Sequence, residues 1–114
     1  NPLVVRHSVE EALAEGGIVT LTEDVTINVA ENAPETVVEN DVVIDLNGKN
    51  LIVNNPKDQI WIRVNNGATL TIDNEAQATR ASEVYSGTII TDCYIASANE
   101  ISPPFESLRN DPSI

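Results

Sequence analysis

The clearest pattern along the chain is an alternation of apolar and polar residues that begins after Gly17. Three segments, which start at Val19, Ile44 and Ile62, read apolar, polar, apolar, and a polar turn and a second such segment follow each of them. Alternation with a period of two is typical of half-buried strands. The sequence therefore predicts three copies of a strand-turn-strand unit, with second strands at residues 25–27, 51–53 and 70–72.

The spacing of these units predicts how they pack. Their starting residues lie 25 and then 18 residues apart, and units of this length that cannot bury their own apolar face are typical of stacked coils. Stacking places Val19, Ile44 and Ile62 in one inward column. The outward column beside it then consists of Thr20, Asp45 and Arg63.

An alternative explanation of the same pattern is an ordinary hairpin arrangement. Asparagine followed by glycine is the strongest short hairpin signal, and it occurs at Asn47-Gly48 and again at Asn66-Gly67. Two such hairpins would form a small antiparallel sandwich. The turns vary in length between the copies, whereas a fixed hairpin register favours two-residue loops, so the repeat favours the stacked coils.

A short helix precedes the first strand. Ser8 and Glu11 have the spacing of a capping box, in which the Ser8 hydroxyl accepts from the Glu11 amide and the Glu11 carboxylate reaches back to the amide of Ser8. Good helix formers follow, and Gly16-Gly17 supplies the residues that end the helix. A helix of about two turns is not stable alone, so we expect one face of it to cover the strands.

The repeat weakens after residue 72. Residues 73–82 read as an inserted loop, and residues 86–95 supply a fourth coil in the same direction. The expected domains are a capped β-solenoid at residues 1–95 and an extended, proline-containing tail or linker at residues 96–114.

Charge limits the partners. Six basic and eighteen acidic residues give a net charge of −12, which repels phosphate backbones and anionic lipid, so we expect no nucleic-acid or membrane partner. Cys93 is the single cysteine and cannot form an internal disulfide. No nucleophile and base, no metal-ligand cluster and no phosphate-binding loop is evident, so the expectation is no catalytic residue, no metal and no cofactor.

Four residues are candidates for an interface. Trp61 precedes an inward position, so alternation turns its ring outward unless a bulge intervenes, and an exposed tryptophan marks a partner or a sugar platform. The other explanation is that the ring packs under the 73–82 loop. Arg63 lies on an outward column, His7 is the single histidine and precedes the helix, and Phe105 lies beside two prolines, where it would anchor the tail on a neighbouring subunit.

Residues 8–21, 43–49 and 64–72 together resemble the start of right-handed parallel β-helix proteins of the pectate-lyase-like class. The stretches Asp45-Leu46-Asn47-Gly48 and Asn66-Gly67 with the residues after it are similar to coils of that class. The resemblance implies an all-β fold, a short right-handed parallel β-helix (solenoid) with an N-terminal capping α-helix. The lyase site of the class needs clustered aspartates and an arginine base. Arg63 has only Asp45 beside it here, so no active site is carried over.

Similar stretches occur in phage virion proteins and in bacterial surface proteins, and the expected functions follow from that. The first is a non-catalytic virion structural protein, a head fibre or capsid decoration that acts as an attachment and spacer element on the capsid surface. It would be a homo-oligomer, with a trimer favoured, and would contact other virion proteins. The first alternative is a bacterial cell-surface or extracellular module that binds glycan or protein, and the second is a fragment of a polysaccharide lyase or hydrolase.

Overall fold

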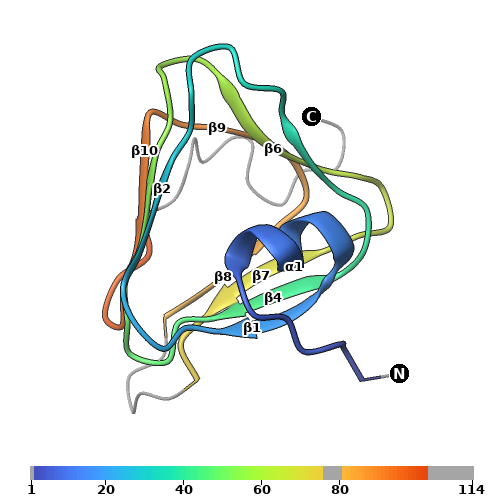
Figure 1. Ribbon diagram of the computed structural model, residues 1–114, viewed down its shortest axis with the longest axis vertical. Coiled ribbons are helices and arrows are strands. Elements are labelled where there is room, and N and C mark those ends of the chain that lie inside the picture. The colour runs from blue at the N-terminus through green and yellow to red at the C-terminus, as the bar shows by residue number, and fades with distance from the viewer. Residues whose placement is uncertain (1, 76–80, 103–114) are drawn as a thin grey trace.

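The computed structural model describes residues 2–75 and 81–102, which form one helix and ten strands in three sheets (Figure 1). The helix is α1 (Val9–Glu15). The strands are β1 (Gly17–Thr20), β2 (Val25–Asn28), β3 (Thr36–Val38), β4 (Val42–Asp45), β5 (Leu51–Asn54), β6 (Ile60–Val64), β7 (Leu70–Asp73), β8 (Ser82–Tyr85), β9 (Gly87–Ile90) and β10 (Cys93–Ala96).

The chain passes through the three sheets in turn and then reverses. The strand orders are β1-β4-β7-β8, β10-β5-β2 and β3-β6-β9. The pairs β1–β4, β4–β7, β2–β5 and β3–β6 are parallel, whereas β8, β9 and β10 run antiparallel to β7, β6 and β5. Figure 1 shows the sheets as the sides of a triangle, with α1 in front of its interior.

The prediction of an all-β, right-handed parallel β-helix with a capping helix is therefore wrong. Each of the three sheets is mixed, because its last strand is antiparallel to the strand beside it. The cause is the reversal between β7 and β8, which pairs Asp73 with Ser82. Residues 86–95 consequently return across earlier strands and add no fourth coil in the original direction. The fold is a small domain of mixed sheets with one short helix.

The third of the predicted units is also misplaced. Val19 pairs with Ile44 as expected, but Ile44 then pairs with Ile72, and Ile62 pairs with Thr36 in another sheet. The sequence pattern does not reveal β3, which is only three residues long, so it predicts units of two strands, whereas each of the first two passages through the sheets has three strands.

The predicted outward column of Thr20, Asp45 and Arg63 fails for the same reason. Thr20 pairs with Asp45, and Asp45 pairs with Asp73, so Arg63 lies in a different sheet.

The hairpin alternative does not hold at its strongest signal. Asn47 and Gly48 do have positive φ values, 51° and 78°. They connect β4 to β5, however, and these strands belong to different sheets, so the turn is a corner between two sheets.

The predicted helix start is confirmed in part. The Ser8 hydroxyl accepts from the amide of Glu11 at 3.1 Å. The carboxylate of Glu11 accepts from the amide of His7 at 2.9 Å, one residue before the expected donor. Val9, Ala12 and Leu13 are buried, and the helix packs against β3, β1 and β4.

An aliphatic core fills the interior, and aromatic rings lie beneath the return strands. Tyr85 and Tyr94 are buried on β8 and β10, and their hydroxyl groups lie 2.8 Å apart in a hydrogen bond. The ring of Tyr94 also contacts Trp61, with 5.9 Å between the centroids. The return strands are thus joined to each other and to β6 through one aromatic group.

We expect the tyrosine pair to be energetically coupled. Tyr85→Phe and Tyr94→Phe should each lower the free energy of unfolding by about 1–3 kcal/mol, because each removes one partner of a buried hydrogen bond. The double variant should lose less than the sum, since it removes both partners. Urea unfolding of the four proteins measures this, and strictly additive losses would show that the hydroxyl groups do not interact.

Candidate functional site

The outer face of the β1-β4-β7-β8 sheet carries a continuous row of uncharged side chains. The cross-strand register aligns its members, which we call the outer stripe: Val5, Ile18, Val43, Thr71 and Val84. They alternate with core residues such as Val19 and Ile44, so they face away from the interior. The two ends are the most open, since Val5 is 69% exposed and Val84 is 42% exposed.

Acidic residues border the outer stripe. Asp45 lies on the outward column next to it, beside Thr20 of β1, and Asp41 lies just before β4 on the other side. The Asp41 carboxylate accepts from the amide of Thr69 at 3.0 Å, which holds it at the start of β7. The face therefore has a neutral centre and an acidic margin.

The sequence contains a signal for the outer stripe that the inward columns alone do not use. Gly17–Thr20 and Val42–Asp45 each contain consecutive apolar residues at Ile18-Val19 and Val42-Val43-Ile44. A strand that is apolar on both faces is buried on both or exposes one apolar face. Ile18 and Val43 are the outward half of that pattern.

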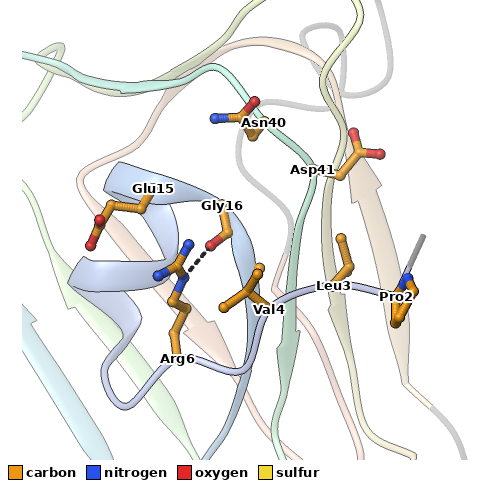
Figure 2. Close-up of a pocket in the computed structure, with 9 residues that line it drawn as sticks. Pro2, Leu3, Val4, Arg6, Glu15, Gly16, Asn40 and Asp41 are labelled. Atoms are coloured by element: carbon orange, nitrogen blue, oxygen red, sulfur yellow. Dashed lines mark hydrogen bonds between the residues drawn. The ribbon is translucent and has the colours of Figure 1, made fainter.

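The first residues of the chain extend this sheet. The amide of Ile18 donates to the carbonyl of Val4 at 2.8 Å, and the amide of Arg6 donates to the carbonyl of Ile18 at 2.7 Å. Figure 2 shows the result, a hollow between this segment, the end of α1 and the residues before β4. The guanidinium of Arg6 donates to the carbonyl of Gly16 at 2.7 Å and so ties the segment to the end of α1.

Gly17 makes this docking possible. Its φ is +117°, and a Cβ at this position would lie 2.2 Å from the carbonyl oxygen of Val4. Only glycine adopts this conformation without strain and leaves room for the backbone beside it. The position of Val5 in the outer stripe therefore depends on Gly17.

Trp61 does not lie on the surface as alternation predicted. The register of β6 shifts between Ile60 and Ile62, which is the bulge that reverses the expected orientation. The ring is 4% exposed and contacts Tyr94 in the core. Trp61 also lines a cleft beside α1.

Arg63 forms the one ion pair between side chains in the described part of the chain, with Glu35. Its Nε and Nη2 donate to the two carboxylate oxygens at 2.6 and 3.0 Å, and Nη1 donates to Thr88 at 3.3 Å. This hydrogen bonding lowers the pKa of Glu35 and raises that of Arg63. Both side chains stay partly exposed, at 40% and 32% for Arg63 and Glu35, so the pair mainly fixes the loop before β3 to β6 and β9.

The remaining candidates are not brought together with these. His7 is exposed just before α1, and only its backbone amide is held, by Glu11. Phe105 lies outside the described residues, as does most of the predicted tail. Whether any of the four candidates contacts a partner stays a prediction.

The described residues, 2–75 and 81–102, contain no group of three or more histidine, cysteine or acidic side chains arranged for a metal ion. In the same residues, the helix is too short to cross a bilayer. The surfaces just described can bind a partner through apolar contact and through backbone pairing. The function proposed below relies on these two kinds of interaction.

Comparisons with protein-family models, with curated proteins and with solved structures find no match for the chain. The resemblance to the pectate-lyase-like class therefore stays an expectation from three short stretches of sequence.

Gly17→Ala should release the N-terminal segment. Gly67→Ala is the matched control, since Gly67 also has a positive φ, +92°, but nothing lies within 4 Å of its added Cβ. We expect about 1–2 kcal/mol of lost stability for the control, from backbone strain alone. Gly17→Ala should lose about 1–3 kcal/mol more, from the forced contact.

Hydrogen exchange checks where that loss arises. Exchange at Arg6 and Ile18 should rise in Gly17→Ala and stay unchanged in Gly67→Ala. Equal stability of the two variants would contradict the proposed role of Gly17.

The contribution of Glu35 should depend on pH. Its folded pKa lies below its ordinary value of about 4.3, because Arg63 hydrogen-bonds to the carboxylate. The stabilisation is therefore present above pH 4.3 or so and is lost as the pH falls through the lower, folded pKa. Wild type should be more stable than Glu35→Gln at pH 7, and the difference in urea midpoint should fade in acid. A difference that does not change with pH would show that the charge of Glu35 plays no part.

Proposed function

We propose that this chain is a non-catalytic attachment and spacer module of a virion, of the head-fibre or capsid-decoration kind. The observation that carries the proposal is the outer stripe, a preformed row of uncharged and mostly apolar side chains on a sheet face. Contiguous apolar surface bordered by polar residues is typical of interaction sites, whereas single exposed apolar residues are not. The virion setting comes from the resemblance in the sequence and is part of the proposal.

A preformed sheet face suits attachment because little has to be ordered on binding. The outer stripe is built on strands that are hydrogen-bonded on both sides from β1 to β7, so its side chains are held in place before a partner arrives. Binding loses affinity when loops and side chains must be immobilised, and a rigid surface avoids most of that loss.

Polar side chains on the outside of the body support the spacer part of the proposal. The amide of Asn54 donates to the side chain of Asn28 at 3.0 Å, one strand away in the parallel pair. Asp24 accepts from the backbone of Asn50 at 2.9 Å in the same manner. Such contacts hold successive passages in register and favour a stiff body.

Copies of this chain are the partner that we propose for the outer stripe, as a closed oligomer with a trimer favoured. The acidic margin formed by Asp41 and Asp45 would lie at the rim of such an interface. Like charges at a rim repel, and salt screens that repulsion. Association should therefore strengthen as the salt concentration rises.

The alternative, a bacterial surface module that binds glycan, relied on Trp61 as a sugar platform. A ring that is 4% exposed and packed on Tyr94 offers no open face for stacking. The observations therefore favour the attachment module over the glycan-binding module.

Solution mass tests the proposal. Val84→Asp places a charge in the outer stripe and should convert the oligomer to monomer in light scattering. Ile95→Asp is the matched control, because Ile95 is equally open, at 44%, but lies on the outer face of β10 in another sheet. The control should keep the oligomer.

A wild-type monomer at high protein and salt concentration, or an oligomer that survives Val84→Asp, would contradict self-association through the outer stripe. An antibody against the chain should label the capsid of purified virus particles. Label confined to bacterial cell walls would favour the alternative.

A further inference from the structure

Each sheet has one edge strand at the end of the molecule that carries α1, namely β1, β2 or β3. Two of these edges are covered, and the third is open. Beyond β1, the N-terminal segment pairs with Ile18 through two backbone hydrogen bonds. Beyond β3, α1 packs against the strand. Beyond β2, no described strand pairs with the edge, and α1 lies across a cleft from it, so among β1, β2 and β3 only β2 lacks a paired segment or a closely packed helix on that side.

The missing neighbour leaves core positions open. Val25 and Ile27 face the interior, yet both are only half-buried. Leu51 and Val53, which pair with them in β5, are fully buried at 0% exposure. The inward-facing side chains are therefore fully buried on β5 and partly exposed on β2.

The backbone of β2 is also open. The amides of Val25 and Val29 donate to the carbonyl groups of Asn50 and Asn54 at 2.9 and 2.8 Å, so these residues direct their polar groups toward β5. Because successive residues of a strand point to opposite sides, Thr26 and Asn28 direct their N–H and C=O groups to the open edge. An edge of this kind is a template for another strand.

A cleft of 360 Å³ lies beside that edge. Its lining is mostly apolar, and the charged residue on it is Glu10 of α1. The other side chains that matter here are Leu13, Ile27, Val29, Pro34 and Trp61. A strand added to β2 would turn every second side chain inward, and those beside Ile27 would enter this cleft.

We propose that the open edge of β2 binds an extended peptide segment of a partner protein by strand addition. The segment has apolar residues at alternate positions, which enter the cleft, and basic residues beside them. We expect basic residues in the peptide because the chain has a net charge of −12 and presents Glu10 at the cleft. Backbone hydrogen bonds supply the affinity, and the alternate side chains supply the specificity.

The side-chain hydrogen bond between Asn28 and Asn54 predicts one further residue type in the peptide. Asn54 donates to Asn28 across one strand spacing, so the residue that pairs with Asn28 on its free side continues a row of amides. We therefore expect asparagine, serine or threonine at that position of the peptide. This site lies in a different sheet from the outer stripe and does not depend on it.

The test uses the full chain and a capped hexapeptide with the sequence lysine, valine, threonine, isoleucine, asparagine, lysine. Trp61 is the single tryptophan and lines the cleft, so its fluorescence reports binding directly. We expect a saturable change with this peptide and none with a scrambled peptide of equal charge.

Backbone methylation distinguishes strand addition from simple adsorption. One derivative carries N-methyl groups on valine and isoleucine, and the other carries them on threonine and asparagine. Because amides alternate along a strand, one derivative should lose about tenfold in affinity or more and the other should bind as before. Equal behaviour of the two derivatives would overturn the proposal.

The protein variants are Thr26→Pro and, as the matched control, Thr26→Ala. Proline removes the edge-facing amide and is tolerated on an edge strand, whereas alanine keeps the amide. Binding should disappear in Thr26→Pro and persist in Thr26→Ala, with circular dichroism showing that both are folded. If Thr26→Pro does not fold, the methylated peptides still decide the question on the wild-type chain.

Two further results would overturn the proposal. One is the absence of any fluorescence change with the peptide. The other is a wild-type dimer that the peptide does not displace and that Thr26→Pro abolishes, because the edge would then belong to a second copy of this chain.

Discussion

The antiparallel pairing of β8, β9 and β10 with β7, β6 and β5 is the constraint on which the rest of the structure depends. It ends the succession of parallel strands and carries Tyr85 and Tyr94 into the interior, where they are buried. The hydrogen bond between the two hydroxyl groups and the contact with Trp61 join all three sheets. Aromatic residues are scarce in the chain, and two of them, Tyr85 and Tyr94, lie on the return strands, with Trp61 packed beside Tyr94.

The Ser8 cap was predictable because it depends on neighbouring residues. The pairing of Val19 with Ile44 was predictable because the alternating pattern repeats at these two segments. Chain direction was not predictable, because an alternating strand has the same pattern in either direction. Residues 86–95 fit a fourth coil as well as a return, and the reversal between Asp73 and Ser82 decides between them.

The surfaces were less predictable than the strands. A register shift in β6 buries Trp61. The three-residue strand β3 pairs with β6, so Arg63 lies in a different sheet from Asp45 and pairs with Glu35. Both depend on contacts between residues far apart in the sequence. The outer stripe and the open edge of β2 follow once the register is known, because the first is the outward face of the β1-β4-β7-β8 sheet and the second is the unpaired edge of the β10-β5-β2 sheet.

The most direct measurement of the central claim is a cross-link between β5 and β10. Cys93 is exposed and lies opposite Asn54, in a pair without mutual backbone hydrogen bonds, since the bonded pair is Asn55 with Asp92. Cα atoms in such pairs are about 4.5 Å apart, which a disulfide accepts. Oxidised Asn54→Cys should form an intramolecular disulfide with Cys93, and Ile52→Cys should not. Free thiols in both variants, or a disulfide in Ile52→Cys alone, would contradict the antiparallel return.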